Sequence, residues 1–248
     1  MPRIHVIIPC FNEAPTLLPC IERIIAVDWP DSWEANVIII NDDSNDSTGD
    51  IAENISRQHE SISLLVHESN RGKGAAVRTG FASALQIARE DDLVVIQDAD
   101  LEYHPSDLIE AIQRFNGDSI DALVGDRFEL WTKPSKMGTF HMLVNHLLTL
   151  ASNRMTGLSL ADMECCYKLI RIPMLRTMLP QLTEPRFGIE PQIAAALARN
   201  GAIVTEGPVS YAPRGVEEGK KIGVRDAIEA IRVIRREHTL TLQSRKHT

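Results

Sequence analysis

The chain has 248 residues, a length that suits one large α/β domain with at most a small appendage. Hydrophobic residues make up 44% of the sequence and charged residues 24%, the proportions of an ordinary soluble globular protein. The formal net charge of −8 excludes a general nucleic-acid-binding protein, because that function needs a basic surface.

Cysteine use and the start of the chain indicate the compartment. The four cysteines, Cys10, Cys20, Cys165 and Cys166, do not follow a zinc-site spacing, so we interpret them as free thiols in a reducing cytoplasm. We expect no signal peptide, because the first three residues lead directly into a strand pattern. The longest apolar stretch, 142–150, falls short of the roughly 20 apolar residues that span a bilayer. These features predict a cytoplasmic protein.

The first hundred residues alternate between apolar runs and amphipathic stretches. We predict strands at 4–9, 37–40, 62–66 and 93–96, and helices at 15–25, from about 48, and at 75–88. Strands that alternate with helices in this way predict a parallel sheet with right-handed crossovers.

The second half of the sequence is less regular. It predicts strands at 122–125, 166–170 and 203–211, and helices at 140–155, 173–178, 188–199 and 225–238. No internal repeat or linker is visible, so we predict a single domain over residues 1–238. The basic residues 239–248 are expected to form a flexible tail.

Three acidic side chains follow the buried apolar run 93–96. Asp98, Asp100 and Glu102 stand at alternate positions, so they would project the same way if extended geometry continued. Carboxylate oxygens at the carboxyl end of a sheet strand suit Mg²⁺ or Mn²⁺. The alternative is a solvated acidic turn before a helix that starts near Pro105.

The other strand-end loops are polar as well. The segments 9–13, 41–48 and 68–74 each follow a predicted strand, and the carboxyl ends of parallel strands share one edge. This coincidence predicts a nucleotide-type site. The first strand lacks a glycine-rich dinucleotide fingerprint, and Arg71 to Gly74 lacks the P-loop spacing, so neither of those site types is favoured.

The ordered set of these motifs resembles the glycosyltransferase family 2 enzymes, which have the GT-A fold. The segments that carry the resemblance are 7–13, 41–48, 70–74 and 98–102. Later segments are similar to the dolichol-phosphate mannosyltransferase branch and its bacterial polyprenyl-phosphate relatives, namely 125–127, 162–168, 186–190 and 211–221. The resemblance covers residues 4 to about 230.

The resemblance implies an α/β GT-A fold, with a Rossmann-like, mostly parallel central sheet that binds a nucleotide-diphosphate sugar. Phe11 stands where a tyrosine is common in the family, and Asn41 where an aspartate is usual. The implied base and ribose contacts are Pro9, Phe11, Glu13 and Asp42. The implied phosphate contacts are Lys73, Arg127, Arg214, Lys220 and Lys221, and the implied metal ligands are Asp98, Asp100 and Glu102.

The activity implied is inverting, metal-dependent transfer of a hexose to a polyprenyl phosphate at the cytoplasmic face of the membrane. GDP-mannose is the first donor expected and UDP-glucose the second. The Gln-x-x-Arg-Trp motif of processive synthases is absent, which disfavours polymer synthesis. Two alternatives stay open: a transferase acting on a soluble or glycan hydroxyl, and a non-catalytic nucleotide-sugar-binding module.

The resemblance also implies catalytic roles for Asp100, Arg127 and Asp162. A divalent cation and basic side chains would stabilise the charge that grows on the leaving diphosphate. A lipid phosphate acceptor is already an anion and needs no strong base, whereas an alcohol would need Asp162 or Glu164 to take its proton.

Each assignment has a structural alternative. Arg127 could pair with Asp126, Asp162 could be a turn residue, and Asp42 could cap a helix. Arg214 with Lys220 and Lys221 could be a solvated loop.

Membrane contact also remains open from the sequence. The helix predicted at 140–155 could pack wholly in the core or could lie on a bilayer. Basic residues near the C-terminus could attract anionic lipid or could form an ordinary solvated face: Arg232, Arg235, Arg236, Arg245 and Lys246.

Overall fold

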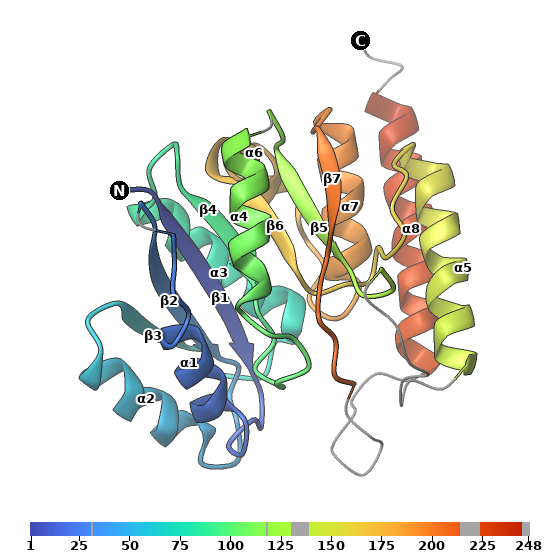
Figure 1. The fold of residues 1–248 in the computed structure, drawn as a ribbon. Helices are drawn as coiled ribbons and strands as arrows, with labels where there is room; N and C mark the ends of the chain where they lie inside the picture. Colours follow the sequence, from blue (N-terminus) through green and yellow to red (C-terminus); the bar gives the residue numbers. More distant parts are fainter. Residues whose placement is uncertain (31, 118, 130–138, 214–223, 245–248) are drawn as a thin grey trace.

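The computed structural model describes residues 1–30, 32–117, 119–129, 139–213 and 224–244 (Figure 1). The predicted phosphate contacts Arg214, Lys220 and Lys221 lie outside these residues.

The described strands form one seven-stranded sheet in the order β3-β2-β1-β4-β6-β5-β7. Strands β1 to β4 run parallel to one another, and β5 is parallel to β7. Among the described strands, only β6 is antiparallel to its neighbours, β4 and β5. This confirms the mostly parallel sheet predicted from the sequence. The strands are β1 Arg3–Cys10, β2 Glu34–Asn41, β3 Ile62–Val66, β4 Leu93–Ile96, β5 Ala122–Asp126, β6 Lys168–Arg171 and β7 Val204–Pro208.

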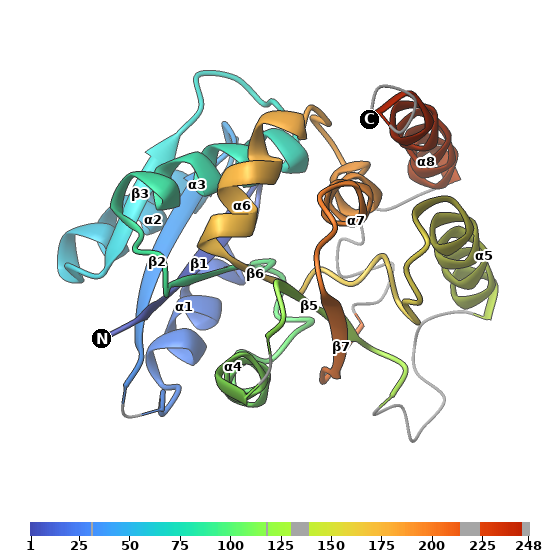
Figure 2. The ribbon, with the colours of Figure 1, turned by 90° about the horizontal axis from the view of Figure 1, so that it is seen from above.

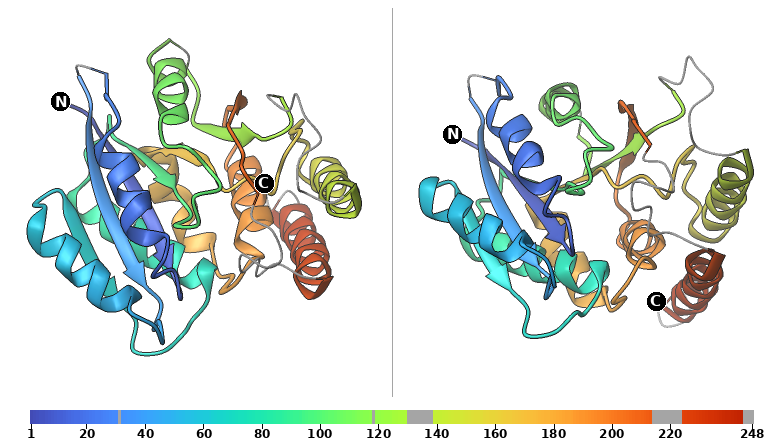
Figure 3. Two further views of the ribbon diagram at one scale, coloured as in Figure 1. Left: turned by 60° about the horizontal axis from the view of Figure 1, so that its bottom comes forward. Right: turned by 90° about the horizontal axis from the view of Figure 1, so that it is seen from below.

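Helices cover both faces of the sheet. Helices α3, α6 and α7 lie on one face and α1 and α4 on the other (Figures 2 and 3). The helices are α1 Leu17–Ile25, α2 Thr48–Gln58, α3 Lys73–Ile87, α4 Asp107–Gly117, α5 Thr139–Thr156, α6 Ile172–Met178, α7 Ile189–Arg199 and α8 Val224–Ser244, with a 3₁₀ turn, η1, at Leu179–Gln181.

The core lies between the sheet and these two helical layers. The apolar residues of β1, β2 and β4 are buried on both faces, as expected for parallel strands covered by helices. Gly80 allows α3 to pack tightly on β1, because a Cβ atom there would lie 2.3 Å from Ile7 Cγ2. The strand ends that carry the polar loops are therefore held by a rigid, close-packed layer.

Two predicted strands are shorter in the structure than in the sequence analysis. Strand β6 begins at Lys168 rather than 166, because the backbone N–H of Cys166 donates to the Tyr103 hydroxyl. Strand β7 ends at Pro208, because the backbone N–H of Ser210 donates to the Asp107 carboxylate instead of a strand. In both cases a side chain has taken the place of the ladder partner.

Helices α5 and α8 lie side by side against α7 at the end of the molecule near β7 (Figures 1 and 2). Three leucines of α5, Leu143, Leu147 and Leu150, are 55%, 54% and 59% exposed, so this helix does not pack wholly in the core. Helix α8 continues to Ser244, so residues 239–244 belong to a helix, not to the tail predicted after residue 238. In the described part of the chain, no helix combines the length and apolarity needed to cross a bilayer.

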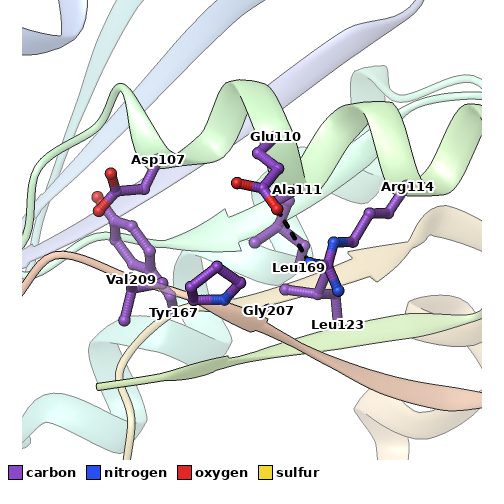
Figure 4. Close-up of a pocket in the computed structure, with 10 residues that line it drawn as sticks. Asp107, Glu110, Ala111, Arg114, Leu123, Tyr167, Leu169, Gly207 and Val209 are labelled. Atoms are coloured by element: carbon purple, nitrogen blue, oxygen red, sulfur yellow. Dashed lines mark hydrogen bonds and ion pairs between the residues drawn. The ribbon is translucent and has the colours of Figure 1, made fainter. Parts of the chain in front are cut away.

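A small cavity lies between α4 and strands β5 to β7 (Figure 4). Its volume is about 10 Å³, enough for roughly one water molecule. Asp107, Glu110, Arg114 and Tyr167 contribute to its wall, and none of the predicted site residues does. The cavity is therefore a packing gap beneath α4 and not the predicted site.

Candidate functional site

The loops after β1 and β2 are joined by hydrogen bonds. The backbone N–H of Glu13 donates to the Thr48 hydroxyl at 2.8 Å, and that of Asn12 donates to the Ser44 hydroxyl at 3.0 Å. The Asn12 side chain accepts from the backbone N–H of Asn45 at 2.8 Å. This pairing brings the end of β1, where Pro9, Phe11 and Glu13 follow one another, beside the acidic segment 41–48. The predicted base and ribose contacts are thus neighbours, while their ligand roles stay predictions.

Asp42 ties the end of β2 to the loop after β3. Its buried carboxylate accepts hydrogen bonds from the backbone N–H groups of Arg71 at 2.9 Å and Gly72 at 2.7 Å. His67 Nδ1 lies 2.6 Å from the same carboxylate, which can only accept, so this nitrogen carries the proton. His67 Nε2 lies 2.9 Å from the Thr79 hydroxyl of α3. His67 was not among the predicted site residues; its place after a predicted strand was the available signal.

Two glycines let a second loop pack against the start of α3. A Cβ atom at Gly72, where φ is +88°, would lie 2.5 Å from the Pro185 carbonyl oxygen. A Cβ atom at Gly74 would lie 2.3 Å from the Glu184 carbonyl oxygen. Larger residues would push these backbones apart. The close approach seats Lys73, which stands between the two glycines, at the helix start.

Lys73 links carboxylates from two elements. Its Nζ atom lies 2.9 Å from Asp98 after β4 and 2.9 Å from Glu190 on α7. Burial alone would lower the pKa of Lys73, but Asp98 and Glu190 raise it well above its ordinary value. The other oxygen of Glu190 lies 3.5 Å from Lys168 Nζ, which also donates to the Cys165 carbonyl. Glu190 and Lys168 fall within segments 186–190 and 162–168 of the resemblance but had no predicted role.

The acidic segment after β4 forms a turn, so the extended geometry on which the alignment of the three carboxylates depended does not continue past the strand. The chain turns at Ala99 and Asp100, and Leu101 adopts a φ of +65° before α4 begins. A turn cancels the alternation that would have aligned the three carboxylates. Asp98 binds Lys73, while Glu102 accepts a hydrogen bond from the Tyr211 hydroxyl at 2.9 Å.

The described residues therefore do not assemble the predicted three-carboxylate metal set. Within the ranges that the structure describes, no three His, Cys, Asp or Glu side chains are grouped so as to hold a metal ion. Asp98 and Asp100 nevertheless share one neighbourhood: burial, then the charges of Asp100 and Asp98, raise the pKa of Cys20 to about 12. Mg²⁺ is commonly held by one or two carboxylates together with substrate phosphates. Asp98 and Asp100 fit such a site, and their metal role stays a prediction.

Arg127 pairs with Asp162, not with its neighbour Asp126. Arg127 Nε donates to Asp162 at 2.5 Å and Nη2 at 2.7 Å, in the bidentate geometry that is strongest for this pair. Asn145 of α5 adds a third donor at 2.9 Å. Asp126 instead accepts from the backbone N–H of Phe128.

These contacts make Asp162 a poor proton acceptor. Burial alone would raise its pKa, but Arg127 and Asn145 hold the pKa of Asp162 below its usual value. Asp162 is fully buried and its two oxygens are both in use. The geometry therefore fits a residue that positions Arg127 and disfavours the general-base role that an alcohol acceptor would require.

Aromatic rings bring Arg127 toward the acidic turn. The guanidinium carbon of Arg127 lies 5.0 Å from the Tyr211 ring centroid and 5.9 Å from that of Phe128. Tyr211 in turn binds Glu102 and lies 5.3 Å from Tyr103, centroid to centroid. Tyr211 thus contacts both Arg127 and the acidic segment. The contact between Tyr103 and Tyr211 was not predicted from the sequence.

A solved structure with the same architecture is glucosyl-3-phosphoglycerate synthase from Mycobacterium tuberculosis, in complex with Mn²⁺, uridine-diphosphate-glucose and phosphoglyceric acid. The two chains superpose with a TM-score of 0.68 at 18% identity, over 96% of this chain and 80% of the other. At this identity the likeness shows a shared fold, which confirms the expected GT-A architecture.

Curated relatives align along most of the sequence. Undecaprenyl-phosphate mannosyltransferase of Micrococcus luteus is 27% identical over 223 residues, which are 89% of this chain and 88% of that protein. Glycosyltransferase AglJ of Haloferax volcanii is 28% identical over 84% of this chain and 63% of that protein. Dodecaprenyl-phosphate galacturonate synthase of Rhizobium johnstonii is 27% identical over 70% of this chain and 49% of that protein. The chain thus spans nearly all of the first relative but only about half to two-thirds of the other two.

The family model described as glycosyl transferase family 2 matches residues 5–179, which is more than half of the chain. This range contains most of β1, all of β2 to β6, and the Lys73, Arg127 and Asp162 side chains, while Glu190 and Tyr211 lie beyond it. The resemblance inferred from the motifs is confirmed: the chain belongs to glycosyl transferase family 2 and is a glycosyltransferase.

Proposed function

We propose that this glycosyltransferase moves a hexose from a nucleotide-diphosphate sugar to a polyprenyl phosphate, with inversion at the sugar C1 and with a divalent cation. The observation that carries the proposal is the pair of cations, Lys73 and Arg127, held by carboxylates at the sheet edge where family 2 motifs lie. The lipid acceptor is supported by the relative from Micrococcus luteus, whose alignment covers nearly the whole of both chains.

Lys73 is suited to bind the donor diphosphate. Its ammonium group stays charged between Asp98 and Glu190, and it stands at the amino end of α3, where the helix dipole also favours an anion. Asp98 and Asp100 would hold Mg²⁺ or Mn²⁺. When bound, the cation would stabilise negative charge on the departing diphosphate.

Arg127 is suited to a second phosphate. Asp162, itself held by Asn145, fixes the guanidinium, so little side-chain entropy remains to be lost when an anion binds. Arg214, Lys220 and Lys221 are proposed to add charge around the same phosphates. Two fixed cations favour positioning over acid–base chemistry, as transfer to an anionic acceptor requires.

The nucleotide is proposed to lie over the joined β1 and β2 loops, beside Pro9, Phe11, Glu13 and Asp42. GDP-mannose is the first candidate donor, because the relative aligned over nearly its full length is a mannosyltransferase. UDP-glucose is the second, because the structure from Mycobacterium tuberculosis contains that donor on the same fold.

Peripheral membrane contact is proposed for α5 and α8, at a cytoplasmic membrane face. Leu143, Leu147 and Leu150 form an exposed apolar stripe at helical spacing. Arg232 and Arg235 are exposed on α8, which lies beside α5 (Figure 1). An apolar stripe beside basic residues is the composition of a helix that lies in a membrane interface.

A transfer assay with two donors and two acceptors tests the function. Purified protein is given labelled GDP-mannose or UDP-glucose, Mn²⁺, and either undecaprenyl phosphate in detergent or a soluble phosphorylated acceptor. We expect label in the organic extract, dependent on the cation and the lipid. Label that stays in the aqueous phase on the soluble acceptor would refute the lipid assignment. Donor binding without transfer to either acceptor would refute both acceptor classes.

A further inference from the structure

Glu164 is a half-buried residue in the segment that leads into β6. Its Oε1 atom is shielded from solvent and accepts no hydrogen bond from the residues that the structure describes. The charges that act on it are Glu190 from α7, Lys168 from β6, Arg127 after β5 and Asp162 in its own segment. Glu164 thus lies among the groups that hold the two proposed phosphate-binding cations.

The cations around Glu164 are matched by other carboxylates. Arg127 is bound by both oxygens of Asp162, and Lys168 lies 3.5 Å from Glu190. If Glu164 were ionised as well, it would add unbalanced negative charge to a buried site, which is unfavourable. A phosphate arriving there as a dianion would make the imbalance larger.

The protonation of Glu164 follows from this setting. Burial, and then the negative charge of Glu190, raises the pKa of Glu164 to about 7, although Lys168 and Arg127 act in the opposite direction. A phosphate monoester gives up its second proton with a pKa of about 6. The raised pKa of Glu164 is therefore close to that of the phosphate, so Glu164 can take the proton of a phosphate monoanion.

We propose that Glu164 binds the acceptor phosphate in its protonated form, donating a hydrogen bond from its carboxyl group to a phosphate oxygen. This inference rests on the proposed function, because it takes a polyprenyl phosphate as the acceptor. Neither the family match nor the predicted catalytic set assigns Glu164 this role.

The proton and bond changes balance as follows. When the acceptor arrives as a monoanion, its P–O–H bond breaks and the proton forms an O–H bond on the Glu164 carboxylate. A phosphate oxygen of the dianion then bonds to the sugar C1, while the bond from C1 to the diphosphate oxygen breaks. The electron pair of that bond leaves on the diphosphate, and Glu164 keeps its proton throughout.

The pH profile of the acceptor kcat/KM tests this role. In the wild-type enzyme kcat/KM should fall about tenfold per pH unit above pH 7.5, because ionised Glu164 repels the phosphate dianion. Glu164→Gln keeps an N–H donor and cannot ionise, so its kcat/KM should stay level from pH 7.5 to 9. A parallel decline in both enzymes, or a level wild-type profile, would overturn the proposal.

Glu206→Gln is the matched control. The Glu206 carboxyl is also partly buried with a raised pKa, and it accepts from the backbone N–H groups of Ala161 and Asp162 in the same segment. This variant should keep the wild-type decline above pH 7.5. If it abolished the decline, the pH effect would belong to the segment and not to Glu164.

Calorimetry of the wild-type enzyme provides a test that needs no variant. Farnesyl phosphate is titrated at pH 8 in two buffers that differ in ionisation enthalpy, which gives the protons exchanged on binding. We expect uptake of close to one proton per phosphate bound, since Glu164 must be protonated. Binding without proton uptake would overturn the proposal.

The two hypotheses fail in different ways. If the wild-type enzyme transfers sugar to no polyprenyl phosphate at any pH, and farnesyl phosphate does not bind, the proposed function is wrong. If transfer and binding occur but show neither the decline nor the proton uptake, the function stands and only the role of Glu164 is refuted.

Discussion

The two halves of the strand-end edge neutralise their carboxylates in different ways. On the β1–β2 side, Asp42 is bound by two backbone N–H groups and by His67. On the β4–β5 side, Asp98 and Asp162 are bound by the side chains of Lys73 and Arg127. Backbone donors fix the shape of a loop, whereas side-chain cations can change partners.

This difference supports the two separate roles proposed along the edge, nucleotide recognition and phosphate binding. The β1–β2 side is set in shape before any ligand arrives, which suits recognition of a rigid group such as a nucleobase. On the β4–β5 side, Lys73 is held by two carboxylates at equal distances, so it can give up one contact to a phosphate and keep the other. Substitutions on the β4–β5 side should therefore have larger effects than substitutions on the β1–β2 side.

The largest effect is expected from Asp100→Asn. Asparagine keeps the oxygen that accepts from the Glu102 backbone N–H at 3.1 Å, so the turn should persist. The loss of one negative charge should lower metal-dependent kcat by about 100-fold or more, in the range seen when one electrostatic contact to developing charge is removed. Steady-state assays across a Mn²⁺ titration measure this. Unchanged turnover would exclude Asp100 from the site.

Asp162→Asn should reduce both stability and activity. The substitution leaves the Arg127 guanidinium buried without its anionic partner, which costs about 3 kcal/mol in the free energy of unfolding. Urea unfolding measures the loss. Transfer should fall as well, because Arg127 is no longer fixed. A variant of wild-type stability would show that the pair contributes nothing to the fold.

Lys73→Met should weaken donor binding with a smaller effect on the fold. Methionine is an unbranched side chain without a charge, so Asp98 and Glu190 lose a common partner. We expect donor affinity to fall about 10- to 100-fold, the value of one charge-assisted contact. Calorimetric titration with UDP and GDP gives the affinity. Equal affinities in both proteins would remove Lys73 from the diphosphate site.

Glu164→Gln should change how stability depends on pH. The pKa of Glu164 rises from 4.5 to about 7 on folding, so the folded state binds more protons between these values. Protonation of Glu164 therefore stabilises the folded state fully below about pH 4.5, and this stabilisation is lost as the pH rises to 7. Relative to the glutamine variant, wild-type stability should fall over that window by about 2 kcal/mol, a value reduced for partial exposure. Parallel stability curves would contradict the raised pKa.

The sequence predicted the sheet well because its strands are continuous apolar runs. Strand β3 matches the predicted range 62–66, although it is an edge strand whose Ser63 and Val66 are exposed. Strand β4 matches the predicted range 93–96, since its burial on both faces leaves a local signature. The turn after β4 left no such signature. Leu101 has a positive φ that a non-glycine residue rarely adopts, and only tertiary contacts can impose it.

The partners of the charged residues could not be predicted for a different reason. Arg127 is adjacent to Asp126 in sequence, yet it pairs with Asp162, 35 residues away. Lys168 and Glu190 are 22 residues apart and meet only because β6 and α7 pack together. Motif resemblance identified the segments, but pairing depends on the three-dimensional arrangement.

The smallest effect is expected from Asp42→Asn, on the fixed side of the edge. Asparagine keeps Oδ1 for His67 and for the backbone N–H of Arg71, but its NH₂ group cannot accept from the backbone N–H of Gly72, a loss of about 1 kcal/mol. If Asp42 acts by holding the loop that carries Lys73, affinity should drop by about the same factor for UDP, GDP and inorganic pyrophosphate. If it contacts the base directly, pyrophosphate affinity should not change while one nucleotide is affected more than the other.

His67→Gln separates these two outcomes further. His67 contacts Asp42 and the Thr79 hydroxyl, so the substitution disturbs the loop anchor while the Asp42 carboxylate itself remains. If both variants lose pyrophosphate affinity, the loop anchored by Asp42 and His67 on the β1–β2 side sets the position of Lys73. Loss confined to Asp42→Asn, and to one nucleotide, would make Asp42 a base contact and leave the two sides independent.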